Sequence, residues 1–336
     1  MEKTDKFKIL CIDGGGIKGL YTARLLARLE DTFKVKVTEC FDMICGTSTG
    51  GLIALAASLG KPMDDIVKFY QDYGGLIFNQ KVKNSRWGRL KLTYRQVFHK
   101  GKYDGKQLIK ALTEVFGTTE IRDSQNFLCI PSYNIISGTP RVFKKDYEKF
   151  DQDDNKKYVD VALATSAAPT YLPVKLLDND YYIDGGVWAN NPVLVGLAEY
   201  LYKFSKLGMF KGVDILSVSS CEVPINEAPK KLKRSFIDWR NTLFDIYSHG
   251  QSEFSHFFLK VLKDQLKFDI NYCRLNNKSP ISPEQAKYIS MDNASQNSQK
   301  LLLGLADNTA RLVKMEEEIL HFFTTSKSIN PLEYGK

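Results

Sequence analysis

The chain has 336 residues, of which 43% are hydrophobic and 26% are charged. This apolar fraction is enough to build a large core, so disordered, collagen-like and low-complexity proteins are excluded. The 47 lysines and arginines exceed the 39 aspartates and glutamates, which gives a net charge of +8. That charge permits an anionic partner such as a membrane surface, a nucleic acid or a nucleotide, but it does not distinguish between these partners.

The N-terminus starts with charged residues and a short strand-like run, without the long apolar stretch of a signal peptide. No later run reaches the roughly 18 apolar residues of a membrane span. We therefore expect a cytoplasmic protein. The six cysteines show no CxxC spacing, which favours buried free thiols over disulfides or zinc ligands.

The first 60 residues alternate between strand and helix patterns. Apolar runs at residues 7–12 and 41–45 each end at glycine, and helical patterns follow at residues 20–33 and 51–58. A strand, a glycine turn and a helix, repeated, are typical of a parallel sheet that helices cover on both faces.

Later segments continue this pattern. Further strands are predicted at residues 127–136, 181–183 and 213–218, and further helices at residues 159–166 and 193–204. Asn191 and Pro192 form an entry signal for the last helix, because asparagine caps free amides and proline suits a first turn.

From about residue 236 the pattern predicts long helices and no further clear strand. We therefore predict an α/β fold with a central, mostly parallel sheet. Residues 1–220 form the catalytic core in this prediction, and residues 221–336 form a mainly helical region packed on the same domain.

The sequence DGGGIKG at residues 13–19 lies between a predicted strand and a predicted helix. Successive glycines allow several N–H groups to converge on one anionic oxygen, either a phosphate or an oxyanion. Gly14, Gly16 and Gly19 also fit the dinucleotide pattern GxGxxG, with Glu39 at the expected distance. Against this alternative, Glu39 directly precedes Cys40 and the next strand, whereas a ribose-binding acid ends a strand.

The sequence GTSTG at residues 46–50 is a GxSxG motif between a predicted strand and a predicted helix. A nucleophile elbow needs this sharp turn, which lifts the Ser48 hydroxyl out of the sheet. The simpler alternative is a serine that caps the following helix.

The sequence DGG at residues 184–186 places Asp184 at the end of a short predicted strand. Strand ends of an α/β sheet open onto one edge, so Ser48 and Asp184 are expected to meet although they are 136 positions apart in the sequence. The simpler alternative is an aspartate that hydrogen-bonds only its own turn.

These three motifs, in this order, resemble those of the patatin-like phospholipase family. The sequences ATSAAPTY at residues 164–171 and ANNP at 189–192 are also typical of that family, and the resemblance spans roughly residues 7–220. It implies a three-layer α/β/α fold and a serine hydrolase of the phospholipase A type, with Ser48 as nucleophile and Asp184 as base. It implies an oxyanion hole formed by the amides around Gly14, Gly15, Gly16, Ile17 and Lys18.

The resemblance also concerns cofactors and partners. It implies a membrane phospholipid substrate, no cofactor, no metal and no nucleic-acid polymer. Bacterial members of this length resemble phospholipase effectors of antiphage systems that cyclic oligonucleotides activate, so it allows such an activator and a homodimer. The basic residues at 230–234 are candidates to line a nucleotide site. One departure is SVSSC at residues 217–221, where relatives often carry Gly-Thr-Gly after the strand.

A Ser-Asp-His triad is the mechanistic alternative, because His249 follows Asp184 in the hydrolase order. His249 lies in a predicted helix without a strand-end signal, and the other three histidines, His99, His256 and His321, have none either, which favours a Ser-Asp dyad.

The stretch from residue 73 to residue 103 contains eight lysines and arginines, interleaved with aromatic and aliphatic residues, and no acid. This composition suits peripheral binding to an anionic bilayer such as the inner membrane, and it equally fits a solvated loop with core anchors.

Overall fold

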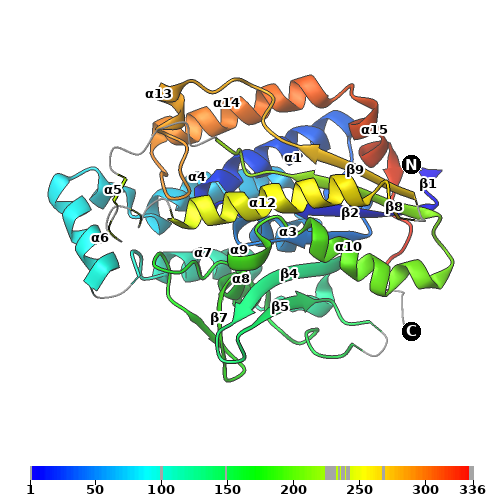
Figure 1. Cartoon of the computed structure of the whole chain (residues 1–336), viewed down its shortest axis with the longest axis horizontal. Coiled ribbons are helices and arrows are strands. Elements are labelled where there is room, and N and C mark those ends of the chain that lie inside the picture. The colour runs from blue at the N-terminus through cyan, green and yellow to red at the C-terminus, as the bar shows by residue number, and fades with distance from the viewer. Residues whose placement is uncertain are drawn as a thin grey trace.

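The computed structural model describes residues 2–98, 101–147, 150–223, 232, 233, 235, 239, 243–266 and 269–332. Within these residues a central sheet of eight strands runs through the molecule, and helices cover both of its faces (Figure 1). The strand order is β6-β7-β4-β3-β2-β8-β9, and β5 pairs with β4. The prediction of a helix-flanked α/β fold is confirmed.

The parallel part of the sheet holds five neighbouring strands. They are β4 (Phe127–Asn134), β3 (Met43–Gly46), β2 (Lys6–Ile12), β8 (Gly212–Val218) and β9 (Asp269–Leu275). Every residue of β3 and β8 is buried, as is all of β2 after Lys6. Burial on both faces explains why these strands are near-continuous apolar runs in the sequence.

Three further strands are antiparallel to their neighbours. They are β5 (Thr139–Lys144), β6 (Lys175–Leu177) and β7 (Asp180–Asp184). The prediction of a mostly parallel sheet therefore holds for the centre of the sheet, whereas the strand that carries Asp184 runs in the opposite direction to β4.

The pairing of β4 explains where β7 lies. A strand has two hydrogen-bonding edges, and β5 takes one of them along residues 129–134. Residues 127–129 use the other edge to pair with β3, and Ser132 uses that same edge to pair with Asp184. The strand β7 therefore pairs with the same edge of β4 as β3 does, further along that edge. Asp184 lies directly beyond the end of β3, where the chain turns to Ser48.

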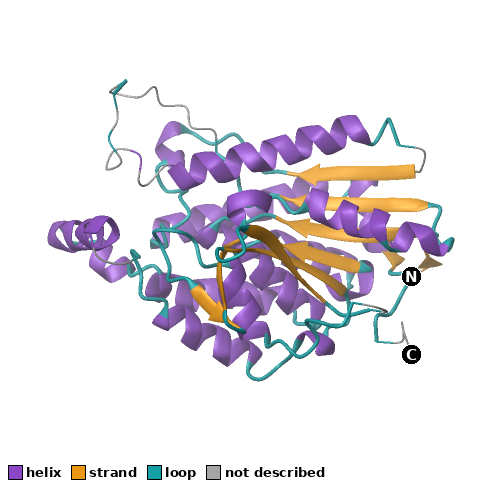
Figure 2. Cartoon of the chain, turned by 60° about the horizontal axis from the view of Figure 1, so that its bottom comes forward, coloured by secondary structure: helices purple, strands orange, loops and turns teal. Residues whose placement is uncertain are grey.

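Side chains of β2 alternate between two cores. Leu10 and Ile12 pack into one cluster, and Phe7, Ile9 and Cys11 pack into the other. The helices that line the first cluster are α1 (Gly19–Phe33), α3 (Thr49–Ser58), α4 (Met63–Ile77), α7 (Lys106–Phe116), α8 (Tyr158–Thr165), α14 (Gln296–Val313) and α15 (Glu317–Thr324). The second cluster is covered by α10 (Val193–Tyr202) and α12 (Leu243–Leu262), so the sheet is the middle of three layers (Figure 2).

The prediction of a C-terminal region without strands is wrong. Strand β9 pairs in parallel with β8 along its whole length and extends the central sheet. Its sequence, DINYCRL, mixes polar with apolar residues. One of the polar residues, Arg274, is buried in an ion pair with Asp13. A search for apolar runs therefore passes over this strand. The short strands β1 (Glu2–Lys3) and β10 (Thr325–Ser326) also pair, in a separate sheet.

The helix entry at Asn191 differs slightly from the prediction. Pro192 occupies the capping position of α10, and Asn191 Oδ1 accepts a hydrogen bond from the Val193 amide at 3.1 Å. All six cysteines are free and buried, as predicted.

The basic stretch forms the end of α4 and two further helices, α5 (Gln80–Lys83) and α6 (Arg86–Phe98). Both project from one end of the molecule (Figure 1). Among the described helices, none combines the length and the apolar character that crossing a bilayer requires.

Candidate active site

Ser48 lies at a sharp turn between β3 and α3. Its backbone φ of 54° falls in the left-handed region, which is costly for a residue with a side chain and is common at functional sites. A Cβ added at Gly46 would lie 2.2 Å from the Gly50 carbonyl oxygen, and one at Gly50 would lie 2.3 Å from the Ile12 carbonyl oxygen. The two glycines of the motif are therefore required by close backbone approach, as in a nucleophile elbow.

Hydrogen bonds to neighbouring elements hold this turn in place. The Ser48 amide donates to Thr165 Oγ1 at 3.0 Å, and Thr165 Oγ1 donates to the Pro131 carbonyl at 2.6 Å. Thr47 Oγ1 donates to the Ala189 carbonyl at 2.6 Å. The Ser48 side chain makes no capping bond to α3, so the interpretation of Ser48 as a helix cap is wrong.

The Ser48 hydroxyl instead donates to Asp184 Oδ2, with 2.6 Å between the oxygens. Asp184 is fully buried, and its Oδ1 accepts the Gly186 amide at 2.7 Å. The alternative of an aspartate that bonds only its own turn is therefore wrong. Burial raises the pKa of Asp184 to about 7, against the opposing effect of the hydrogen bonds from Ser48 and Gly186.

The glycine loop packs against the turn and against two distant segments. A Cβ on Gly14 would lie 3.4 Å from Ser48 Cβ and 2.5 Å from Asn190 Oδ1. A Cβ on Gly16, whose φ is 61°, would lie 2.0 Å from the Met291 carbonyl oxygen. No larger residue fits these two positions without moving the backbone or its neighbours.

The amides of this loop are not equally free. The Gly14 amide donates to the Asn190 carbonyl at 3.0 Å, the Ile17 amide to the Met291 carbonyl at 2.8 Å, and the Lys18 amide to the Gly15 carbonyl at 3.2 Å. Among the described residues, the amides of Gly15 and Gly16 have no such partner. The predicted set of five oxyanion donors therefore narrows to these two.

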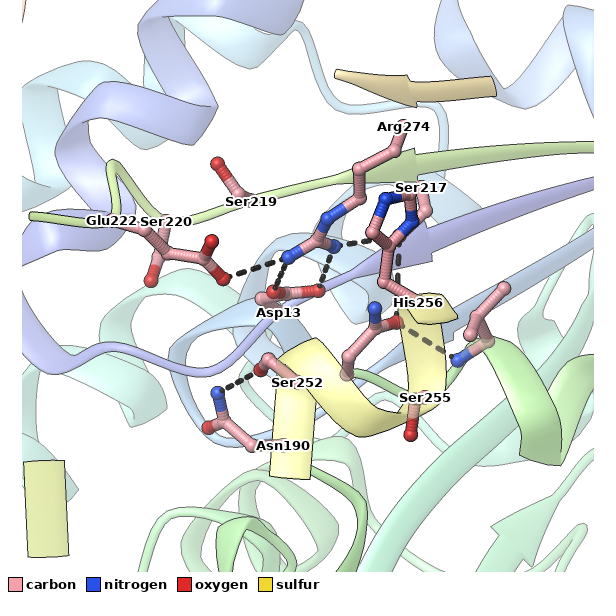
Figure 3. Close-up of polar contacts among 12 residues, drawn as sticks. Asp13, Asn190, Ser217, Ser219, Ser220, Glu222, Ser252, Ser255, His256 and Arg274 are labelled. Carbon is pink, nitrogen blue, oxygen red and sulfur yellow. Dashed lines mark hydrogen bonds and ion pairs between the residues drawn. The ribbon is translucent and has the colours of Figure 1, made fainter. Parts of the chain in front are cut away.

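A buried ion pair supports the start of the loop (Figure 3). Both Nη atoms of Arg274 donate to the two carboxylate oxygens of Asp13, at 2.8 and 2.5 Å. Arg274 also donates to Ser217 Oγ at 2.7 Å and to Glu222 Oε1 at 2.8 Å. Burial raises the pKa of Asp13 to about 6, although the guanidinium opposes this shift, so Asp13 is ionised at neutral pH.

The segment that departs from the family pattern reinforces the same loop. Ser220 Oγ donates to the Gly14 carbonyl at 2.7 Å. Cys221 has a φ of 57°, the left-handed conformation that glycine favours, so the backbone makes a sharp turn directly after this serine.

A cavity of about 440 Å³ opens beside Ser48. The glycine loop forms one wall, through Gly14, Gly15 and Lys18. The other walls come from the C-terminal region, through Phe244 to His249 on α12 and through the segment from Ile281 to Met291, which includes α13 (Pro283–Ala286). An ester that enters this cavity meets the Ser48 hydroxyl.

The histidines do not complete a triad in this structure. His249 lies in the cavity wall, but both oxygens of Asp184 are already occupied by Ser48 and Gly186. His256 bonds to the Tyr272 hydroxyl at 2.8 Å, and His321 bonds to Asp214 at 2.5 Å. His99 lies outside the described residues.

The dinucleotide alternative finds no support at Glu39. This residue belongs to the short helix α2 (Val37–Cys40), and its carboxylate accepts the Lys36 amide at 3.0 Å. It caps its own helix and does not end a strand.

The basic stretch divides into two groups. Lys83 and Lys102 form ion pairs with Asp292 at 2.9 and 2.6 Å, and they lower the pKa of that carboxyl to about 2 despite its burial. Lys81, Arg86 and Lys91 are exposed. Lys100, like Lys230, Lys231 and Arg234 of the candidate nucleotide site, lies outside the described residues.

Comparisons with known proteins identify the family of this chain. The family model described as Patatin-like phospholipase matches residues 10–197, from β2 to α10. The chain belongs to the patatin-like phospholipase family. It is thus a hydrolase of lipid esters, which favours the phospholipase interpretation of the glycine loop over the dinucleotide alternative.

Curated relatives extend this similarity beyond the matched residues. A "cGAMP-activated phospholipase" from Pseudomonas aeruginosa is 32% identical over 84% of this chain and 80% of its own length. A protein of the same description from Vibrio cholerae is 30% identical over 97% of this chain and 94% of its own. Among solved structures, human GIVD cytosolic phospholipase A2 is 10% identical with a TM-score of 0.42, over 95% of this chain and 60% of that one.

The sequence did not indicate two residues that shape this phospholipase site. Arg274 contacts the glycine loop through an ion pair, and Met291 contacts it through its carbonyl oxygen. Every residue type has a backbone carbonyl, so the identity of Met291 does not reveal its contact. Arg274 is 261 positions from Asp13, so the sequence does not show that the two residues pair. Only an arginine within an otherwise strand-like run signals a buried charge.

Proposed function

We propose that this phospholipase hydrolyses acyl esters of membrane phospholipids through an acyl-enzyme on Ser48, with Asp184 as the base. The observation that carries the proposal is the 2.6 Å hydrogen bond from the Ser48 hydroxyl to a fully buried carboxylate. A carboxylate with an ordinary pKa is a weak base toward serine. Burial raises the pKa of Asp184 to about 7, which makes it a better proton acceptor.

In the first step, Ser48 Oγ attacks the acyl carbonyl and Asp184 takes the hydroxyl proton. The amides of Gly15 and Gly16 stabilise the oxyanion that forms. Asp184 then returns the proton to the departing lysophospholipid alcohol. In the second step, water attacks the acyl-enzyme, Asp184 takes a proton from that water, and Ser48 recovers the proton when the fatty acid leaves.

The surface of α6 supports a bilayer as the source of the substrate, so we propose peripheral binding of the active protein to the inner membrane. Trp87, Leu90 and Tyr94 are spaced along one helix face and are 83%, 62% and 60% exposed. Arg86 and Lys91 on the same helix and Lys81 on α5 are exposed as well. Aromatic and basic side chains in this mixture favour the interface of an anionic membrane.

A cyclic oligonucleotide is the proposed activator, in a role in antiphage defence. The support is the description of the Pseudomonas aeruginosa and Vibrio cholerae relatives as activated by cGAMP, one of them similar over 97% of this chain. A homodimer is the proposed assembly. An apolar face of α12 supports it, with Tyr247, Phe254 and Phe257 each at least 55% exposed.

The test is release of fatty acid and lysophospholipid from vesicles of phosphatidylethanolamine and phosphatidylglycerol, measured by mass spectrometry. The purified full chain is assayed beside Ser48→Ala, with and without a panel of cyclic oligonucleotides that includes cGAMP. We expect release by the wild type that a cyclic oligonucleotide increases, and none by Ser48→Ala. Full activity without a nucleotide would contradict the activator, and activity of Ser48→Ala would contradict the nucleophile.

A further inference from the structure

A second group of chemically reactive side chains lies in the wall of the catalytic cavity. Glu222, His249 and Glu253 each offer one ligand atom, and these atoms all lie within 4.8 Å of one another. Glu222 and His249 line the same cavity as Ser48. The dyad mechanism uses none of the three.

The elements that carry these residues fix their positions independently of one another. His249 and Glu253 are four residues apart on α12, so their side chains lie on one face of a long helix. Glu222 comes from the segment that follows β8. A pair of ligands at this helical spacing and a third from another element form a common frame for a metal ion.

The partners of Glu222 leave it able to bind an ion. Arg274 contacts Glu222 only through Oε1, while both of its terminal nitrogens also contact Asp13. Among the described residues, Glu222 Oε2 has no hydrogen-bond partner. Asp13 and Glu222 share the guanidinium of Arg274, and Lys18 and Lys287 also line the cavity.

A further polar atom nearby lacks a partner. Ser248 is 8% exposed and lines the same cavity, and its hydroxyl has no hydrogen-bond partner among the described residues. Buried hydroxyls are rarely left unpaired, so an unpaired one in a cavity wall points to a bound water or ligand. Ser248 precedes His249 in the chain and lines the same cavity.

We propose that Glu222, His249 and Glu253 bind a divalent transition-metal ion in the wall of the catalytic cavity. One imidazole and two carboxylates suit Zn²⁺ or Mn²⁺, whereas Ca²⁺ and Mg²⁺ prefer oxygen ligands alone. Ligand atoms around a tetrahedral zinc ion are roughly 3.4 Å apart. The exposed side chain of Glu253 closes the remaining gap by rotation.

The location of the site suits an ion that binds the lipid headgroup. Three protein ligands leave at least one coordination position open, and Glu222 and His249 border the cavity that contains Ser48. A phosphodiester oxygen of a lipid headgroup is an anionic ligand of the kind that this position takes. The ion therefore orients the headgroup, while bond cleavage stays with Ser48 and Asp184.

The test is metal binding by the purified full chain after removal of metals with a chelator. Isothermal titration with ZnCl₂ measures affinity, and pulsed electron paramagnetic resonance of bound Mn²⁺ detects the nitrogen of a coordinated imidazole. We expect one ion per chain with an imidazole coupling. His249→Ala removes this coupling, and Glu253→Gln lowers affinity by about tenfold or more.

His256→Gln is the matched control, because His256 lies on the same helix and bonds to Tyr272 outside the group. It keeps the wild-type affinity, and thermal melts of the metal-free variants establish that each is folded. Equal binding by wild type and a His249→Ala/Glu253→Gln double variant overturns the proposal, as does wild type that binds no ion. Ser48→Ala binds the ion like wild type, so the failure of this proposal and the failure of the dyad are distinguishable.

Discussion

The two parts of the chain contribute to the catalytic cavity in different ways. Residues up to 220 supply the proposed reacting groups, Ser48 and Asp184, and the amides of Gly15 and Gly16, which lack a backbone partner among the described residues. Residues beyond 220 supply Arg274, which holds Asp13, and Met291, whose carbonyl holds the Ile17 amide. The first part carries sequence motifs, and the second carries none that the family resemblance could assign.

This difference follows from what each group must do. The Ser48 turn needs glycine on both sides and a φ of 54°, so few residue types are acceptable there. A cavity wall needs only volume and a charge of the right sign, which many sequences provide. Motifs therefore indicate the chemistry of the site, and the structure is needed to find its supports.

The sharpest contrast is between removing a reacting group and removing a support. Ser48→Ala and Asp184→Asn should each lower kcat by about 10³-fold or more, because neither proton transfer nor acyl transfer has a substitute. Hydrolysis of a short soluble ester, followed spectrophotometrically, measures this loss without membrane binding. His249→Ala is the comparison, and a loss of similar size in that variant would favour the triad.

Arg274→Met tests the principal support. It leaves the buried Asp13 and the partly buried Glu222 without their guanidinium partner, which should lower the free energy of unfolding by about 3–5 kcal/mol. Urea denaturation measures this change. Arg274→Met combined with Asp13→Asn should recover part of the lost stability, since one uncompensated charge is removed. No recovery would indicate that Arg274 acts through packing alone.

Gly16→Ala tests the contact between the two parts. The added methyl group would lie 2.0 Å from the Met291 carbonyl oxygen, at a φ of 61°. The loop must shift, and loss of one oxyanion donor should lower kcat by about 10²-fold or more. Gly304→Ala is the control, because nothing lies within 4 Å of its added methyl group in α14. That variant should keep full activity and gain about 0.5–1 kcal/mol of stability.

The pKa of Asp184 predicts how activity depends on pH. The base must be ionised, and burial raises its pKa to about 7. The value of kcat/KM should therefore fall roughly tenfold for each pH unit below that pKa and reach a plateau above it. A profile that is flat between pH 5 and pH 8 would contradict a buried carboxylate base.

The same shift predicts a stability effect of opposite direction. Because the pKa of Asp184 is raised, the folded protein holds a proton between about pH 3.8 and about pH 7 that the unfolded chain has released. The stability that protonated Asp184 contributes is therefore complete below about pH 3.8. It is lost as pH rises through about 7. Asp184→Asn should therefore raise Tm relative to wild type by more at pH 8 than at pH 5. Differential scanning calorimetry at the two pH values measures this difference.

The smallest effect is expected at α6, far from the reacting atoms. Leu90→Ala should weaken binding to anionic vesicles by up to about tenfold and leave hydrolysis of a soluble ester unchanged. Ile136→Ala is the matched control, since both side chains are 62% exposed and Ile136 lies outside the basic stretch. Equal vesicle sedimentation of the two variants would show that α6 is not the membrane-binding surface.

The sequence allowed accurate prediction where local pattern and backbone demand coincide. The helix predicted at residues 20–33 is Gly19–Phe33, and the meeting of Ser48 with Asp184 was expected. The reason given for that meeting was wrong, because β7 is antiparallel and reaches Ser48 by continuing the edge of β3 along β4. Strand direction depends on pairing over long sequence separations, which periodicity does not contain.

The oxyanion loop shows a second limit. Five amides were candidates from the glycine-rich motif, and three of them have carbonyl partners, two of these on Asn190 and Met291. Every residue type offers a carbonyl group, so no residue pattern distinguishes the free amides from the bonded ones.

The most direct test of the dyad is to trap the acyl-enzyme. Wild-type protein is mixed with a phospholipid of known acyl chain, quenched in acid within the first turnover, digested and sequenced by mass spectrometry. The account predicts that the acyl group is found on Ser48 and is absent from Ser48→Ala and Asp184→Asn. An acyl group on another residue, or undiminished lipid hydrolysis by Ser48→Ala, would contradict it.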